Sequence, residues 1–218
     1  VRLKSFLYSH LARRAHTHAN FVTVDSAAMK AKLNEFLGLD SYVIQNGINV
    51  DKLSKYRDFD GKYRILSMRG IAPNYRILEI LAQADSIKPN VISVCCPFVE
   101  SDYYSNVLDK KAENVLFLEQ LDRVQFHDVL RETKVVISIP ESDSSPRSVY
   151  EAIFSGAIAI CTSNRYVDDL PLSMRRRIVL VDIQTTNWLL KALHEADVLL
   201  LLPFEPCDTA VEMYDQMK

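Results

Sequence analysis

Two carboxylates lie on either side of a predicted helix start, within the stretch that runs from Lys134 to Cys161. Asp143 belongs to a polar loop and Glu151 lies about one turn into the helix, with seven residues between them. A carboxylate accepts hydrogen bonds from paired hydroxyls, such as those of a ribose or a hexose. The free N–H groups and partial positive charge of a helix N-terminus suit a diphosphate. The spacing fits such a site, and it also fits a loop cap at Asp143 and a solvated helix residue at Glu151.

Four residues between the two carboxylates belong to the same candidate site. Ser145 and Ser148 add hydroxyl donors. Pro146 suits the first turn of a helix, where its missing N–H costs nothing. Arg147 lies beside them, and we include it with these three as a ligand-binding residue.

A second chemical feature follows an apolar run near residue 65, in the segment MRGIAPNYR. Arg69 lies where an open α/β sheet binds anions, and its guanidinium group fits a phosphate bidentately. Gly70 would let the backbone approach a ligand closely. A solvated surface arginine is the alternative that the residue type alone leaves open.

Both features lie in a regular alternation of predicted strands and helices. The predicted strands are Tyr63–Met68, Val91–Val94, Val115–Leu118, Val135–Ile139, Ala157–Cys161 and Ile178–Val181. The predicted helices are Tyr75–Ala84, Asp102–Lys111, Val124–Arg131, Ser148–Ser155 and Trp188–Leu202. This alternation predicts an α/β fold with a doubly wound, Rossmann-like parallel sheet. Because such sheets bind ligands at the carboxyl ends of their strands, we expect the two features to share one edge.

The segments before and after this alternation are shorter and less regular. They are predicted as a basic amphipathic helix at Leu3–Ala15, a strand at Phe21–Val24, a helix at Ala27–Leu37, a strand at Tyr42–Ile44, an irregular linker at Asp51–Gly61 and a C-terminal helix at Thr209–Met217. In isolation, an αL turn would explain the dipeptide Asn46-Gly47. We therefore divide the chain at residues 1–50, 51–200 and 201–218, with the Rossmann-like domain in the middle.

The composition is that of an ordinary soluble globular protein, with 48% hydrophobic and 25% charged residues among 218. A formal net charge of −2 makes no case for a nucleic-acid partner. No Gly-x-Gly-x-x-Gly and no P-loop occur, which argues against a dinucleotide dehydrogenase and a P-loop NTPase. The cysteines Cys95, Cys96, Cys161 and Cys207 show no metal spacing, so buried thiols in a reducing compartment are expected.

Two further expectations concern metals and membranes. His16 and His18 have no cysteine or carboxylate close in sequence, so no metal site is predicted. We find no signal peptide, and the longest apolar run is too short to span a membrane. The chain is therefore expected to be cytoplasmic. Its basic N-terminal helix could also contact acidic lipid at a membrane surface, although a solvated face explains it as well.

The run from Asp143 to Gly156 resembles the signature of retaining glycosyltransferases with the GT-B fold, the large family that includes sucrose and glycogen synthases. That signature is an acidic residue, seven residues, Glu-Ala, a small or apolar pair and then Gly before the next strand. Glu151-Ala152 and Gly156 match it, and the first acidic residue, usually Glu, is Asp143. Residues 21–50 resemble the end of the family's N-terminal domain and its passage into the second domain.

The resemblance implies the C-terminal, donor-binding half of such an enzyme with a small remnant of the N-terminal acceptor domain. It would transfer a sugar from a nucleotide-diphosphate sugar to an acceptor hydroxyl, with retention of configuration. By the same resemblance, Glu151 would hold the ribose hydroxyls and Asp143 would face the hexose. Arg69, helped by the helix N-terminus, would stabilise the leaving diphosphate, and Glu119 would lie near the base. No metal or other cofactor is implied.

This chain also departs from the family pattern. The family usually has Lys five residues after the Arg, and that position is Asn74; Arg76 could supply the charge instead. A Gly-x-Gly that often follows the second strand is replaced by Cys95-Cys96-Pro97-Phe98, and His127 is expected on a helix surface. Three alternatives stay open: a non-catalytic nucleotide-sugar-binding or interaction module, a GT-B sugar-nucleotide epimerase and a regulatory α/β domain.

The partners implied by the resemblance are a nucleotide sugar, an acceptor sugar, lipid-linked glycan or protein, and the missing N-terminal domain. We expect the 218 residues alone to bind donor and to transfer sugar poorly or not at all. The apolar faces of the helix Tyr75–Ala84 and of the C-terminal segment could pair two copies as a homodimer.

Overall fold

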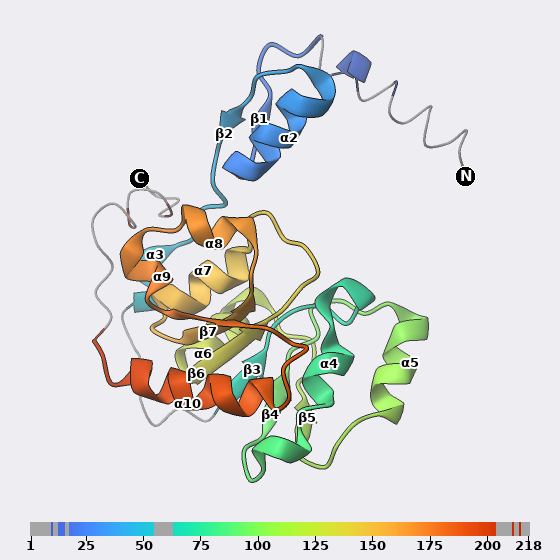
Figure 1. Ribbon diagram of the computed structural model, residues 1–218, viewed down its shortest axis with the longest axis vertical. Coiled ribbons are helices and arrows are strands. Elements are labelled where there is room, and N and C mark those ends of the chain that lie inside the picture. Colours follow the sequence, from blue (N-terminus) through green and yellow to red (C-terminus); the bar gives the residue numbers. More distant parts are fainter. Residues whose placement is uncertain are drawn as a thin grey trace. The chain divides into compact units, whose positions relative to one another are not determined.

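The computed structural model describes residues 10, 13–15, 18–54, 63–203, 211 and 214 (Figure 1). The predicted helix Leu3–Ala15 and the predicted C-terminal helix Thr209–Met217 lie mostly outside these residues, as do residues 55–62 of the predicted linker and Cys207. The chain divides into two compact units, Val1–Asn46 and Gly47–Lys218, and each is described by itself.

The first unit contains two short parallel strands, β1 (Thr23–Val24) and β2 (Tyr42–Val43), joined through helix α2 (Ala27–Leu37). The Ser26 hydroxyl caps α2 by accepting from the Met29 N–H at 3.2 Å, and Gly38 ends the helix at φ 65°. These three predicted elements are confirmed. The explanation of Asn46-Gly47 as an αL turn is wrong, because neither residue has a positive φ.

A six-stranded, wholly parallel sheet forms the centre of the second unit, in the order β5-β4-β3-β6-β7-β8. Its strands are β3 (Tyr63–Ser67), β4 (Ile92–Val94), β5 (Val115–Phe117), β6 (Thr133–Ser138), β7 (Ile158–Thr162) and β8 (Ile178–Val181). All six match the predicted strands within two residues at each end. The chain builds outward from β3 in one direction and then from β6 in the other, so the order reverses between these two strands.

Helices cover the sheet on both faces (Figure 1). They are α3 (Val50–Ser54), α4 (Ile77–Leu81), α5 (Ser101–Asp109), α6 (Arg123–Arg131), α7 (Arg147–Phe154), α8 (Arg165–Asp169), α9 (Leu172–Arg175) and α10 (Trp188–Leu200), with 3₁₀ turns η1 (Pro73–Tyr75) and η2 (Asp85–Ile87). The α/β class with a doubly wound parallel sheet is therefore correct.

Three helix predictions need correction. The predicted helix Tyr75–Ala84 is broken at Arg76, whose φ of 53° separates η1 from α4. Residues Val50–Ser54 form α3 where an irregular linker was predicted. The helices α8 and α9 were not predicted, because five and four residues are too short to show a helical period.

Two apolar clusters fill the two faces of the sheet. Leu66, Val136 and Ala159 belong to the cluster under α6 and α7, whereas Ile65, Ile137 and Ile158 belong to the cluster under α4 and α10. Successive strand residues point to opposite faces, which explains the near-continuous apolar runs in the sequence.

One of the two faces proposed for homodimer pairing is used inside the unit. Ile77, Ile80 and Leu81 of α4 are buried in the second cluster, and Leu78 is partly buried against it. The C-terminal segment lies mostly outside the described residues, although its Tyr214 is buried in the first cluster. Pairing through that segment stays a prediction. None of the helices in the described part of the chain combines the length and the apolar character needed to cross a membrane.

One buried arginine joins three chain segments next to β8. Arg177 is buried and donates to the carbonyls of Leu199 and Leu202, both at 3.1 Å, and to the carbonyl of Gly156. It thus joins the end of α10 to the turn between α7 and β7. Backbone carbonyls buried without partners cost free energy, so this side chain stabilises the packing of both elements.

Replacing this residue should destabilise the fold. We expect Arg177→Leu to lower the free energy of unfolding by about 3 kcal/mol, because three hydrogen bonds from a buried charged group to backbone carbonyls are lost. Urea denaturation followed by circular dichroism measures the change. The matched control is Arg176→Leu, at an exposed neighbouring position, for which a change within about 0.5 kcal/mol is expected. Equal losses in the two variants would contradict the assignment.

Candidate functional site

The reversal of strand order brings two loops together at the carboxyl edge of the sheet. The loop after β3 carries Arg69, and the loop after β6 carries Asp143. The Glu141 N–H donates to the Asn74 carbonyl at 2.8 Å, which ties the loops to each other. The N-terminus of α7 begins at the end of the second loop. The two features singled out in the sequence therefore form one site.

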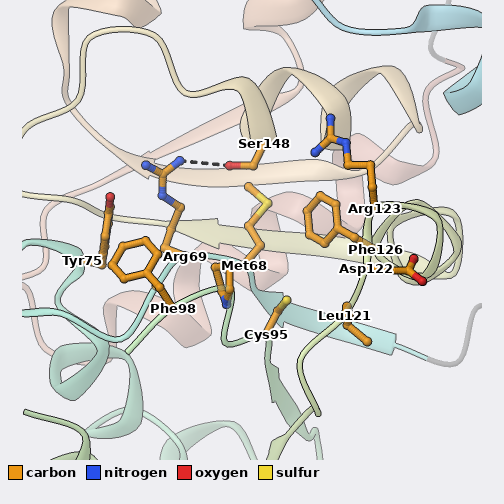
Figure 2. Close-up of a pocket in the computed structure, with 12 residues that line it drawn as sticks. Met68, Arg69, Tyr75, Cys95, Phe98, Leu121, Asp122, Arg123, Phe126 and Ser148 are labelled. Atoms are coloured by element: carbon orange, nitrogen blue, oxygen red, sulfur yellow. Dashed lines mark hydrogen bonds between the residues drawn. The ribbon is translucent and has the colours of Figure 1, made fainter. Parts of the chain in front are cut away.

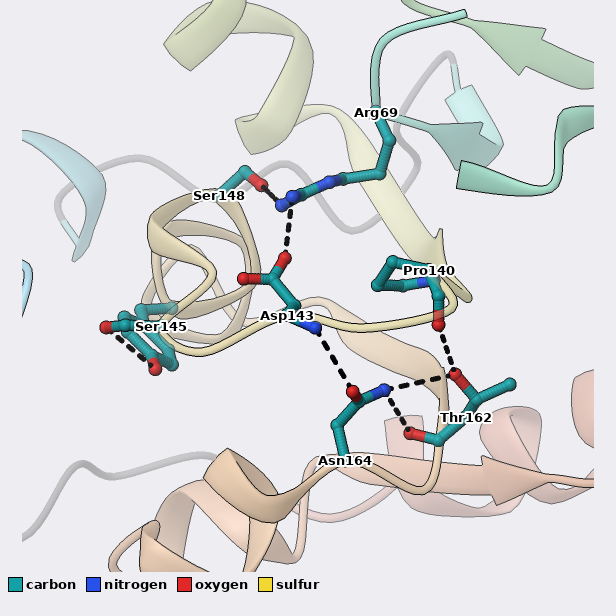
Figure 3. Close-up of polar contacts among 8 residues, drawn as sticks. Arg69, Pro140, Asp143, Ser145, Ser148, Thr162 and Asn164 are labelled. Carbon is teal, nitrogen blue, oxygen red and sulfur yellow. Dashed lines mark hydrogen bonds and ion pairs between the residues drawn. The ribbon is translucent and has the colours of Figure 1, made fainter. Parts of the chain in front are cut away.

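Arg69 is the centre of the polar contacts in this site (Figure 3). Its Nη2 lies 2.6 Å from Asp143 Oδ2, and its Nη1 donates to Ser148 Oγ at 2.9 Å. The side chains of Arg69 and Asp143 are only 15% and 14% exposed. The guanidinium carbon also lies 4.8 Å from the centroid of the Tyr75 ring. The solvated alternative for Arg69 is therefore wrong.

The loop that carries Asp143 is held by residues that the sequence analysis missed (Figure 3). The Asp143 N–H donates to Asn164 Oδ1 at 3.2 Å. The Asn164 amide in turn donates to the Thr162 carbonyl and hydroxyl at 3.4 and 3.3 Å, and the Thr162 hydroxyl donates to the Pro140 carbonyl at 3.2 Å. Asn164 therefore positions the carboxylate, and no sequence signal marked it because it reads as an ordinary turn residue.

A cavity of about 280 Å³ extends from Arg69 toward the start of α6. It is lined by Met68, Arg69, Gly70, Tyr75, Cys95, Pro97, Phe98, Leu121, Asp122, Arg123, Phe126 and Ser148. Figure 2 shows Arg69 with two aromatic rings at one end and Leu121 with Arg123 at the other. Apolar side chains lie between the ends, so the cavity combines one apolar floor with two cationic groups.

The aromatic end of the cavity explains the glycine after Arg69. The rings of Tyr75 and Phe98 meet edge to face at 5.7 Å. A Cβ on Gly70 would lie 2.4 Å from a carbon of the Phe98 ring, so any side chain there would displace this ring. The room that the missing side chain leaves is thus filled by Phe98, rather than left for a ligand to approach the backbone.

Glu151 is buried, with only 1% of its side chain exposed. Its Oε1 accepts from Arg123 Nη2 on α6 and lies 3.3 Å from Arg147 Nε on α7. Burial raises the pKa of the carboxyl group, and the charges and hydrogen bonds of the two arginines oppose that shift. The solvated alternative for Glu151 is therefore wrong, because α7 packs this residue against α6.

His127 was predicted on a helix surface. It is instead on the buried face of α6, next to Glu151 of α7. Its Nε2 lies 3.8 Å from Glu151 Oε1, too far for a hydrogen bond. Burial lowers the pKa of His127 to about 4, helped by the positive charges of Arg123, Lys52, Arg131 and Arg147. This histidine is therefore neutral in the native protein near pH 7.

A second cavity of about 450 Å³ lies along one side of α6. It is lined by Asp51, Lys52, Arg123, Val124, His127, Asp128 and Arg131. Arg123 lines both cavities, so its side chain lies at the boundary between them. Neither this cavity nor a role for Arg123 was predicted, because α3, which supplies part of the cavity wall, was expected to be a linker.

The remaining predicted site residues lie as follows. Ser145 is buried and accepts from the Tyr150 hydroxyl at 3.3 Å, and Pro146 stands at the N-cap of α7. Of the predicted site residues, Arg69, Gly70 and Ser148 line the first cavity. The others do not line it, although Leu121, two residues after Glu119, does; they are Arg76, Glu119, Asp143, Ser145, Pro146, Arg147 and Glu151.

The described thiols are buried or half-buried. Cys95 and Cys161 are buried free thiols and Cys96 is half-buried. Among the residues that the structure describes, no three His, Cys, Asp or Glu side chains are grouped as metal ligands.

The buried histidine should make stability depend on acidity. The folded-state pKa of His127, about 4, lies below the usual value of 6.5, so the unfolded chain takes up a proton first as the pH falls. Stability contributed by the neutral ring is complete above about pH 6.5 and is lost toward pH 4, by up to about 3 kcal/mol. We expect His127→Gln to flatten the stability profile in that window, measured by urea denaturation from pH 4 to 8. An unchanged slope would show that the ring titrates normally.

No protein-family model and no curated protein matches the sequence. Solved structures do match. HepE from Anabaena, in complex with UDP and glucose, has a TM-score of 0.75 at 13% identity, over 94% of this chain and 62% of that one. The sucrose-phosphate synthase of Thermosynechococcus elongatus has a TM-score of 0.71 at 15% identity, over 88% and 52%. AviGT4, a glycosyltransferase involved in avilamycin A biosynthesis, has a TM-score of 0.62 at 19% identity, over 88% and 58%.

These likenesses concern the fold. The chain spans between 52% and 62% of the length of these three structures. The TM-scores of 0.62 to 0.75 establish a shared architecture. Because the identities are only 13% to 19%, the chemistry has to be argued from the site itself.

Proposed function

We propose that this chain, which has the fold of a GT-B C-terminal domain, is the donor-binding half of a glycosyltransferase. In this proposal the whole enzyme transfers a sugar from a nucleotide-diphosphate sugar to an acceptor hydroxyl with retention of configuration. The acceptor and a second domain complete the reaction, so the present chain binds donor and transfers sugar poorly by itself. No metal is required, because cationic and helix-terminal groups can balance the diphosphate charge.

The observation that carries the proposal is the convergence of Arg69, Ser148 and the α7 N-terminus beside one cavity. Arg69 and Ser148 line that cavity and are hydrogen-bonded to each other. They lie at the point where the strand order reverses, which is where open α/β sheets bind ligands. A guanidinium group, a hydroxyl and free helix N–H groups are together suited to a diphosphate. HepE shares the fold at 13% identity, and its structure is a complex with UDP and glucose.

The cavity suggests an orientation for the donor (Figure 2). We place the nucleoside at the end formed by Leu121, Asp122 and Arg123, close to Glu151. The diphosphate then lies near Ser148 and Arg69. The transferred sugar lies beyond it, against the edge-to-face rings of Tyr75 and Phe98 and near Asp143.

In the proposed reaction, the bond between the anomeric carbon and a diphosphate oxygen breaks, and the acceptor hydroxyl oxygen bonds to the same face of that carbon. Negative charge builds up on the departing diphosphate, which takes up the proton of the acceptor hydroxyl. Arg69 and the α7 N-terminus stabilise that charge in the transition state. Asp143 now holds Arg69 through a 2.6 Å ion pair. The carboxylate therefore has to share or release the guanidinium group when the diphosphate binds, and it then faces the sugar.

A second candidate function is a non-catalytic nucleotide-sugar-binding or interaction module. The observation that favours it is charge pairing. Arg69 and Arg123, the arginines that line the cavity, are each held by a carboxylate, Asp143 and Glu151. The position of the family's second cation is Asn74. A site with so little unpaired positive charge can bind a nucleotide without accelerating its chemistry.

Nucleotide binding by this chain is the first test. We expect one of UDP, GDP or ADP, present at about 100 times its dissociation constant, to raise the unfolding temperature by about 5–10 °C. The physical reason is that ligand bound only to the folded state adds about 2.7 kcal/mol to its stability. Differential scanning fluorimetry measures the shift.

Two variants give this test its specificity. Glu151→Ala should lose most of the shift, because the carboxylate proposed to hold the ribose is gone. Glu195→Ala, on the exposed side of α10, should keep it. The absence of a shift with every nucleotide and its sugar conjugate would count against a donor site in this chain.

The role of Arg69 can be separated from general binding. We expect Arg69→Met to weaken binding of the preferred nucleoside diphosphate about 10- to 100-fold, since charge-assisted hydrogen bonds contribute about 1.5–3 kcal/mol. Binding of the free nucleoside should change little. Isothermal titration calorimetry measures both. The same titration of Arg76→Met decides whether the other proposed cation contributes to diphosphate binding. If Arg69→Met lowers the affinities for the nucleoside and the nucleoside diphosphate equally, Arg69 does not contact the phosphates.

A further inference from the structure

Two neighbouring side chains, one on α6 and one on α7, each have a buried polar atom without a hydrogen-bond partner among the described residues. These atoms are Nε2 of His127 and Oε2 of Glu151. Both arginine contacts of Glu151 go to its other oxygen, Oε1. Each unpaired buried polar group costs free energy, so a site with two of them on neighbouring side chains is unusual in a native fold.

The two groups do not satisfy each other. The distance from His127 Nε2 to Glu151 Oε1 is 3.8 Å, which exceeds hydrogen-bond range. A protonated histidine would close this gap as an ion pair. Three positive charges on α3 and α6 (Lys52, Arg123 and Arg131) and one on α7 (Arg147) oppose that protonation, together with burial of the ring. The neutral ring therefore has a hydrogen-bonding nitrogen to offer to a third group.

Access to these atoms depends on one side chain. Arg123 is 50% exposed, bonds Glu151 and lines both cavities. Arg123 and His127 also lie one helical turn apart on the same face of α6. Glu151 lines neither cavity and His127 lines only the second. A molecule in the first cavity can therefore reach Glu151 Oε2 and His127 Nε2 only if the Arg123 side chain shifts from the boundary between the cavities.

We propose that His127 is a second ribose-binding residue, which acts with Glu151 on the two hydroxyls of the donor nucleoside. This inference rests on the proposed function, because it assigns the nucleoside to the α6 end of the cavity. One hydroxyl donates to Glu151 Oε2, which can only accept. The other bonds His127 Nε2, which donates or accepts according to its tautomer. Glu151 and His127 thus bind both hydroxyls of the ribose, and they discriminate against nucleotides that lack one of them.

The test measures discrimination rather than affinity alone. The full 218-residue chain is titrated calorimetrically with UDP, GDP and ADP and with the 2′-deoxy and 3′-deoxy form of each. For the wild type we expect the preferred ribonucleotide to bind about tenfold more tightly than at least one of its deoxy forms. His127→Phe, which keeps a ring without nitrogen, should bring that ratio close to one for the deoxy form that lacks the hydroxyl bound by His127, while Glu151 keeps the preference at the other hydroxyl.

Three further variants complete the design. His127→Gln keeps a donor and an acceptor and should retain several-fold discrimination. His127→Leu replaces the Phe variant if thermal unfolding shows that the larger ring is not accepted. His194→Phe, at an exposed position of α10, is the matched control and should discriminate as the wild type does.

The outcomes separate the two proposals. Nucleotide binding with unchanged discrimination in the His127→Phe variant overturns the role of His127 and leaves the donor site intact. Wild-type binding with no preference for the ribonucleotide also overturns it. Failure of the wild type to bind every nucleotide overturns the proposed function together with this inference.

Discussion

The reversal of strand order between β3 and β6 is the constraint on which the site depends. In a parallel sheet every crossover returns the chain to the same edge, so each strand is followed by a loop at its carboxyl end. Where the order reverses, the two neighbouring loops lead away to different helices and a crevice remains between them. Arg69 and Asp143 follow these two strands, and the reversal joins them in an ion pair although they are 74 residues apart in the chain.

In this structure the carboxylates and arginines of the crevice are paired with one another. A carboxylate removed from water is destabilised by several kcal/mol unless cations or hydrogen bonds compensate it. Both carboxylates of the site are compensated in this way, Asp143 by Arg69 and Glu151 by Arg123 with Arg147. A diphosphate has to compete with Asp143 for the Arg69 guanidinium group. The affinity for a nucleotide therefore reports the difference between two ionic arrangements, rather than the strength of a single new contact.

The aromatic end of the cavity is built in part by the segment that follows β4. The residues Cys95-Cys96-Pro97-Phe98 follow β4, and the ring of Phe98 fills the room beside Gly70. Tyr75 meets that ring edge to face and also lies under the Arg69 guanidinium group. The wall is thus aromatic and also contacts a cation. In the proposed enzyme this wall would contact the transferred sugar, and it is the place where its specificity would differ from that of enzymes with a glycine-rich turn.

The sequence by itself determined the order of strands and helices, the α/β class and the grouping of Arg69 with Asp143. Apolar runs and helix-ending glycines are local signals, and the topology of a parallel sheet follows from their alternation. Only the tertiary structure decided that Glu151 and His127 are buried, that Asn164 positions Asp143, and that Arg123 borders both cavities. The physical reason is that burial and pairing depend on which helix packs against which. Segments distant in the chain meet there, and no local pattern records the partner of α6 or the loop that Asn164 reaches.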